Sequence, residues 1–173
     1  MSDRSHRGTI FVEDAELLEA RQYPGQQYVI RLRAPKCAAA ATPGSFAHLT
    51  CDPLLPMRRP LSIMRADVKA GWIDILYKII GPGLEALSKQ PQGATISVMG
   101  PIGKGFVPSP GRPRTLLVGG GVGIPPMVFL AESLKLAYHR QFRDPCRRYA
   151  GLHRRLVFFY GHGQHRDHRR LAR

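Results

Sequence analysis

Alternating apolar and polar side chains dominate the first half of the chain and predict β-strands. Tyr28–Arg33 and Trp72–Ile80 have the period of two that marks a strand with one buried face, and in the second segment Asp74 and Lys78 fall on the outer face. Further strands are expected over 45–51 and 94–99, and a short helix over 84–89. Pro–Gly pairs and other turn residues separate these segments. Short strands at this spacing favour a small antiparallel barrel.

The pattern changes at the Pro- and Gly-rich stretch 108–113, which we take as the end of a first domain over 1–108. Thr115–Val118 is a short apolar run that predicts a strand buried on both faces. A glycine turn over 119–123 and a helix from about Pro126 to Tyr138 follow. Strand, glycine turn and helix are the opening of a Rossmann-like unit, so we assign 113–137 to an incomplete nucleotide-binding domain. The predicted fold class is therefore β plus α/β.

The net charge of +14 is concentrated in a tail, residues 138–173, which holds ten arginines, no lysine and two aspartates. One interpretation is a nucleic-acid-binding segment, in which arginines contact phosphates and aromatic residues stack on bases. The other is a basic, disordered tail without a selected partner, and it is favoured because no nucleic-acid-binding motif is present. His162, His165 and His168 have helical spacing, but the glycines and arginines around them oppose a metal site.

Other sequence features exclude several classes of protein. The longest uncharged run, 115–131, is interrupted by glycines and prolines, so no membrane span is expected. The polar N-terminal segment has no apolar core of a signal peptide, which makes the cytoplasm the expected location. Cys37, Cys51 and Cys146 are far apart, so no structural metal site is assigned and each is expected to be a small buried residue.

Four motifs have residue types suited to binding a nucleotide. Arg58–Ile63 places arginine and serine at the start of a strand, where a guanidinium can hold a phosphate. Gly81–Leu84 is a glycine turn that opens a helix, and its backbone N–H groups can approach an anion. Gly100–Phe106 is a tight glycine loop, after which Phe106 could pack on a cofactor or plug the barrel, and the plug is favoured. Gly119–Pro125 stands where a dinucleotide fingerprint would, although its spacing is different. Each motif alone also fits an ordinary structural turn.

Together, in this order and spacing, the motifs resemble the ferredoxin–NADP reductase superfamily, and within it the electron-transfer subunits of NAD-dependent dihydroorotate dehydrogenase. The resemblance runs from about Gly8 to Lys135. It implies a Greek-key barrel that binds FAD, followed by a nicotinamide-nucleotide domain. By resemblance, Arg59 neutralises the FAD phosphates and Ser62 is the catalytic residue beside the reactive flavin nitrogen. The implied cofactor-binding residues are Arg59, Pro60, Leu61, Ser62, Leu76, Tyr77, Lys78, Gly81, Gly83, Leu84, Gly119, Gly120, Gly121, Val122, Gly123, Ile124 and Pro125.

The function implied by the resemblance is that of a flavoprotein electron-transfer subunit in pyrimidine biosynthesis. Such a subunit passes electrons through FAD between a catalytic dehydrogenase subunit and NAD(H). The family's cysteine cluster for a 2Fe–2S centre is not found in this sequence, and Leu84 replaces the usual Thr or Ser. Only 61 residues follow Arg112, so we expect a chain truncated or frameshifted after about residue 137, with NAD-linked turnover weakened. The alternative is nucleic-acid binding through the basic tail.

Overall fold

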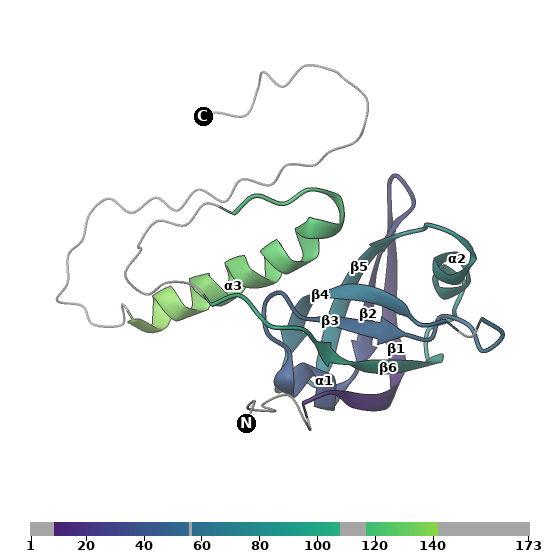
Figure 1. Cartoon of the computed structure of the whole chain (residues 1–173), viewed down its shortest axis with the longest axis horizontal. Helices are drawn as coiled ribbons and strands as arrows, with labels where there is room; N and C mark the ends of the chain where they lie inside the picture. Colours follow the sequence, from purple (N-terminus) through teal and green to yellow (C-terminus); the bar gives the residue numbers. More distant parts are fainter. Residues whose placement is uncertain (1–8, 56, 108–116, 142–173) are drawn as a thin grey trace, which may run out of the picture.

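The computed structural model describes residues 9–55, 57–107 and 117–141, with side chains to Leu134 in the last of these ranges. It shows a β-barrel with the long helix α3 along one side (Figure 1). The elements, in chain order, are β1 (Phe11–Tyr23), β2 (Gln27–Arg33), α1 (Pro35–Ala40), β3 (Phe46–Leu49), β4 (Arg59–Asp67), β5 (Trp72–Lys78), α2 (Pro82–Ser88), β6 (Thr95–Ile102), a 3-10 turn (Gly121–Gly123) and α3 (Ile124–Gln141).

The six strands form a closed antiparallel barrel in the order β1-β2-β5-β4-β3-β6, which confirms the predicted barrel. Strands β2 and β3 follow each other in the chain but are not neighbours in the barrel, and the same holds for β5 and β6. These two connections therefore cross the ends of the barrel. The inner positions of the strands make up the main core. Ile30, Leu32, Ile63, Ile73 and Ile75 have no exposed surface. The alternation in 28–33 and 72–79 therefore predicted the inner face correctly.

Two elements of the barrel domain were not predicted. Strand β1 has four carboxylates and no clean alternation of apolar and polar residues. Its sequence alone therefore does not predict its pairing with both β2 and β6. Helix α1 starts with proline at its first turn, but Ala34 provides no side-chain cap. Instead the Glu13 carboxylate, from β1, accepts hydrogen bonds from the backbone N–H groups of Lys36 at 3.2 Å and Cys37 at 2.7 Å. A residue distant in sequence thus satisfies the free N–H groups at this helix start.

Several expectations need correction. Leu117 and Val118 are not in a strand, since no strand in the described parts of the chain lies beside them to pair with. Phe106 is not a plug of the barrel, because 47% of it is exposed and its ring lies against Gly44. Asp74 is on the outer face as expected but is only 2% exposed. The helix predicted over 84–89 begins at Pro82, the residue type favoured in a first helical turn.

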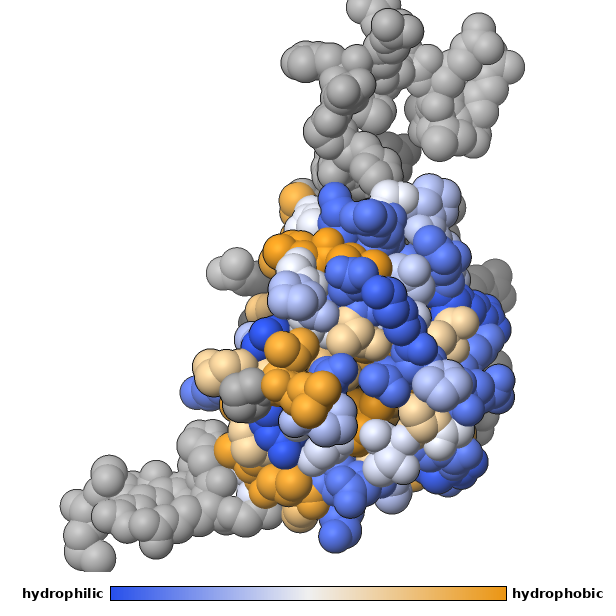
Figure 2. Space-filling model, turned by 90° about the vertical axis from the view of Figure 1, so that its right-hand side faces the viewer, coloured by the Kyte–Doolittle hydropathy of each residue, from blue (hydrophilic) through white to orange (hydrophobic). Residues whose placement is uncertain are grey.

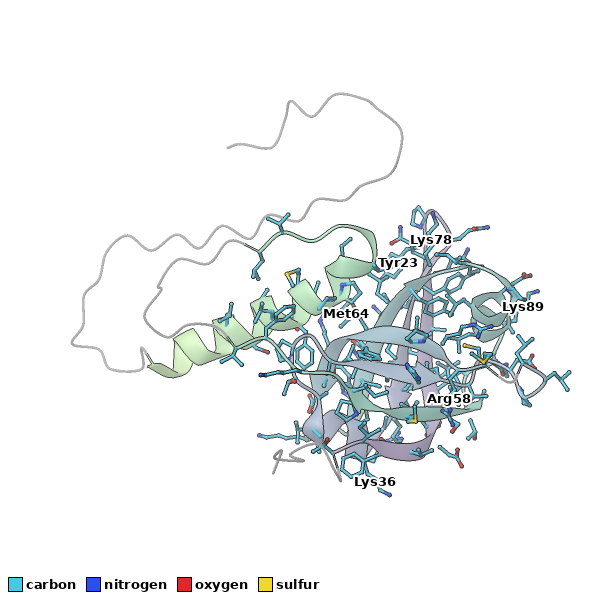
Figure 3. The ribbon with its side chains drawn as sticks, in the orientation of Figure 1. Tyr23, Lys36, Arg58, Met64, Lys78 and Lys89 are labelled. Atoms are coloured by element: carbon cyan, nitrogen blue, oxygen red, sulfur yellow. The ribbon has the colours of Figure 1, made fainter. Side chains whose placement is uncertain are left out.

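Helix α3 packs on strand β4, and Figure 3 shows the labelled Met64 of β4 beside the helix. Met64 is 5% exposed. A second small apolar cluster on the helix side consists of Leu117, Leu130 and Ala131, with Met127 and Leu134 packed against it. None of the helices within the described ranges is long and apolar enough to cross a membrane. The boundary stretch 108–113, Thr115 and Leu116 of the predicted strand, and the basic tail beyond Gln141, with its three spaced histidines and Cys146, lie outside the described residues.

Candidate functional site

A cleft of about 450 Å³ opens between the barrel and the start of helix α3. Strand residues of β4 and β5 form one side, and the glycine turn before α3 forms the other. The cleft is lined by Gln27, Pro60, Leu61, Ser62, Leu76, Tyr77, Lys78, Ile80, Leu84, Gly121, Val122, Ile124 and Pro125. Its volume is in the range of sites for small molecules and cofactors, which is about 300–1,000 Å³.

The barrel side of the cleft lies where β4 and β5 separate. These strands pair from Ile63 and Ile75 onward, whereas Pro60–Ser62 pair only with β3 and Leu76–Lys78 only with β2. Pro60 is therefore tolerated, although β4 is not an edge strand as a whole. The separation leaves one side of each backbone without a strand partner. Backbone N–H and C=O groups are then available to a flat polar ligand, because buried backbone groups need partners.

Arg59 lies at the start of α2. A Cβ atom built on Gly83 would be 2.7 Å from Arg59 Nε and 3.1 Å from one of its terminal nitrogens, so a side chain here would displace this guanidinium. One terminal nitrogen of Arg59 donates to the Met57 carbonyl at 2.9 Å, which fixes the group. Gly81 adopts φ = 78°, a conformation that favours glycine, and turns the chain into α2. A fixed guanidinium beside the first N–H groups of a helix suits a phosphate.

The other side of the cleft is the glycine turn and the first residues of α3. At Gly119 a Cβ would come within 2.8 Å of the Gly123 carbonyl oxygen and 2.9 Å of Met127 Cγ, so this glycine is needed for close packing. Gly120, Gly121 and Gly123 have open space around them, and Gly121 has φ = 52°. The turn can therefore present its backbone closely to a ligand, because no side chain stands between them.

The rim of the cleft is apolar and exposed. Ile80 is 71% exposed and Val122, on the opposite wall, is 85% exposed. Figure 2, which faces the side of the molecule where α2 lies, shows apolar patches separated by hydrophilic side chains. A ligand entering this cleft would cover two apolar side chains that are otherwise in water.

Tyr77 is the lining residue with an unsatisfied polar atom. Its ring stacks on Tyr28 with centroids 5.6 Å apart, and the residue is 5% exposed. Its hydroxyl has no hydrogen-bond partner in the described parts of the chain. Burial, with Cys51 and Tyr28 nearby, raises the pKa of this hydroxyl above its ordinary value. It therefore stays a neutral donor, and a buried donor of this kind normally finds a partner.

The structure brings most of the sequence-predicted residues together. Eleven of them line the cleft itself, while Arg59 and Gly83 meet next to it at α2. Gln27 and Ile80 also line the cleft and were not predicted. Gln27 is opposite Lys78 in the β2–β5 ladder, so only the strand pairing could have identified it. The roles assigned to individual residues, including Ser62, remain predictions.

Among solved structures, the fold is similar to an NADH-dependent reduced ferredoxin–NADP oxidoreductase, with a TM-score of 0.66 at 27% identity over 71% of this chain and 44% of that one. A phthalate dioxygenase reductase shares the fold with a TM-score of 0.58 at 19% identity, over 86% of this chain and 43% of that one. The barrel, the cleft and these likenesses show that the chain belongs to the ferredoxin–NADP reductase superfamily.

Within this superfamily the curated relatives are electron-transfer subunits of dihydroorotate dehydrogenase B (NAD⁺). The protein from Desulforamulus reducens is 38% identical over 128 residues, which are 71% of this chain and 48% of that protein. The one from Bacillus caldolyticus is 44% identical over 98 residues, 53% of this chain and 37% of that protein. The chain therefore spans about half the length, or less, of these relatives. No family model matches it.

Proposed function

We propose that this chain is the FAD-carrying part of an electron-transfer subunit of the dihydroorotate dehydrogenase B type. The single observation that carries the proposal is the cleft at the separated ends of β4 and β5, with Arg59 fixed beside it against Gly83. Backbone groups and a guanidinium suit two parts of FAD, a flat polar ring and a diphosphate. The relatives' names supply the partner reaction.

The residues present fit such a cofactor. Pro60–Ser62 and Leu76–Lys78 would hold the ring through their unpaired backbone groups, and Arg59 with the Gly81–Gly83 turn would hold the diphosphate. Leu84 contributes no hydroxyl to the phosphate, so the backbone N–H groups and Arg59 carry that contact. When bound, FAD supplies the two-electron redox chemistry, which the side chains of this protein do not have.

The chain's own residues would orient the ring and limit the access of water to it. Ser62, half-buried on β4, would place its hydroxyl next to the reactive nitrogen and hold a proton there. The turn Gly119–Pro125 would give a nicotinamide nucleotide access to the other side. Electrons would pass between a catalytic dehydrogenase subunit, the FAD and NAD(H). The pathway, pyrimidine biosynthesis, follows from the relatives' names and not from the cleft.

Reconstitution tests the proposal directly. The purified chain is titrated with FAD and, separately, with FMN, and absorption and flavin fluorescence report binding. We expect about one FAD per chain, bound more tightly than FMN, because only FAD has the diphosphate that Arg59 and the α2 turn would hold. A protein that takes up neither flavin would overturn the proposal. Equal affinity for both would remove the role of Arg59. Anaerobic addition of NADH to the FAD-loaded protein then tests the nicotinamide part separately.

A further inference from the structure

Four charged side chains of alternating sign cross the outside of the molecule from β2 to α3: Arg31, Asp74, Arg65 and Glu132. Asp74 on β5 is opposite Arg31 on one neighbouring strand and Arg65 on the other. Arg31 holds both carboxylate oxygens of Asp74, at 2.7 and 2.8 Å. Arg65 Nε lies 2.8 Å from an oxygen of Glu132, which is on α3. The row thus joins the barrel to the helix.

A β-bulge gives Arg65 its outward direction. The β4–β5 register runs from Ile63 opposite Ile75 to Arg65 opposite Asp74, so Met64 is an extra residue on β4. Without the bulge, residues 61, 63 and 65 would all face the barrel interior, as Ile63 does. With it, Ala66 packs on the core and Arg65 turns toward the helix. Bulges commonly re-aim side chains in this way near functional sites.

Asp74 fixes the barrel end of the row. Its side chain is 3% exposed, and the guanidinium that neutralises it lies 3.7 Å from the centre of the Trp72 ring. A buried carboxylate held on both oxygens has little freedom to move. Arg65 is opposite Asp74 across the strand pair, but both oxygens of that carboxylate are held by Arg31, so the Arg65 guanidinium is left to pair with Glu132. Arg65 therefore offers Glu132 a preset partner.

We propose that Arg65 and Glu132 are positioning residues that lock α3 onto the barrel and so hold the second wall of the cleft in place. The same helix begins with Ile124 and Pro125, which line the cleft, and Glu132 is about two turns further along it. Apolar packing at Met64 stabilises the contact between α3 and β4, but the hydrophobic effect has no directional preference and does not fix the position of the helix along the strand. The ion pair sets where along β4 the helix rests. This inference rests on the proposed flavin site for its functional readout only.

A double-mutant cycle tests the lock in the full chain. Glu132→Gln, Arg65→Gln and the double variant are loaded with FAD, and the FAD release rate is measured by fluorescence after dilution. Partly exposed ion pairs have modest energies, so each single variant is expected to speed release about two- to fivefold. The double variant should release FAD at a rate within about twofold of the single variants, because both substitutions break the same interaction. High salt should speed release from the unsubstituted chain more than from the variants, because the variants keep the salt-sensitive phosphate contact of Arg59 but have lost the ion pair.

The matched control is the pair of Arg33 on β2 and Glu16 on β1, whose charged atoms are 3.1 Å apart and about half exposed, like those of the proposed lock. Arg33→Gln and Glu16→Gln should leave FAD release unchanged. Fully multiplicative effects at Arg65 and Glu132, or equal effects in the control pair, would overturn the inference.

A second readout does not need flavin. Amide hydrogen exchange of α3 over 127–134 should be faster in Glu132→Gln than in the unsubstituted chain, while exchange in β1 and β2 stays the same. Unchanged exchange in α3 would overturn the lock. If the chain binds no FAD but α3 exchange responds as described, the proposed function fails and the lock stands.

Discussion

Replacing Arg59 by glutamine tests the phosphate end of the candidate site most sharply. In the structure Arg59 uses one terminal nitrogen on the Met57 carbonyl, at 2.9 Å, and its remaining donors lie beside Gly83 at the start of α2. Glutamine keeps a polar side chain, but it is shorter than arginine and has no positive charge. The barrel core is not touched by this change.

The expected magnitude follows from the charge-assisted hydrogen bonds that would be lost. A hydrogen bond that involves a charged group contributes about 1.5–3 kcal/mol, and about 1.4 kcal/mol corresponds to a factor of ten in the dissociation constant. Removing one such group from a diphosphate should therefore weaken FAD binding about 10- to 100-fold. FMN binding should change less, because FMN has a single phosphate and no diphosphate to bridge the site.

The preceding residue gives a matched control. Arg58 donates to the Ser97 carbonyl at 3.1 Å and to Ser97 Oγ at 3.0 Å, and Figure 3 shows it near β6. Arg58→Gln should lower the melting temperature, since it removes contacts between strands, but leave the FAD dissociation constant within about twofold. Isothermal titration of the cofactor-free protein measures both variants. Equal loss of FAD affinity in Arg58→Gln and Arg59→Gln, or no loss in Arg59→Gln, would refute the assignment.

Further predictions concern packing, the orphaned hydroxyl, a turn and a buried thiol. Gly83→Ala should weaken FAD binding about tenfold with the barrel still folded, because its Cβ would press on the Arg59 guanidinium at 2.7 Å; unchanged affinity in the same titration would contradict this. Tyr77→Phe should leave the melting temperature of the cofactor-free protein unchanged or higher, since the buried hydroxyl has no partner in the described residues, and a clear drop would show a missed hydrogen bond. Gln26→Gly should raise the free energy of unfolding by about 0.5–1 kcal/mol in urea titrations, because Gln26 has φ = 58° in the β1–β2 turn; a loss of stability would argue against that turn. Burial raises the pKa of Cys37 from 9.0 to about 12, so the thiol ionises first in the unfolded chain. Its contribution to stability should be constant below pH 9 and fall above it by up to about 1.4 kcal/mol per pH unit, and Cys37→Ala should make the alkaline slope of the unfolding free energy shallower.

Much of the candidate site could be predicted because its motifs are local. Each motif is recognisable from a few adjacent residues. Gly81–Gly83 indicates a turn, Gly119–Gly123 a close backbone approach, and Arg59 next to Pro60 a charge at a strand start. Their order along the chain pointed to one superfamily before any contact was known. By contrast, Gln27 is an ordinary residue that reaches the cleft only through its pairing with Lys78, so no local signal identifies it.

The sequence by itself determined the inner faces of β2 and β5, the turns between strands and which segments have residue types suited to a nucleotide, because these depend on neighbours a few positions away. The tertiary structure decided what depends on distant partners. The Glu13 carboxylate caps α1 from another strand, Asp74 becomes a buried ion-paired group through Arg31, and the bulge at Met64 turns Arg65 toward Glu132. Whether β4 and β5 pair or separate at Ser62 is also a property of the closed barrel, since strand register is set by all the strands together. The cleft exists because of that separation.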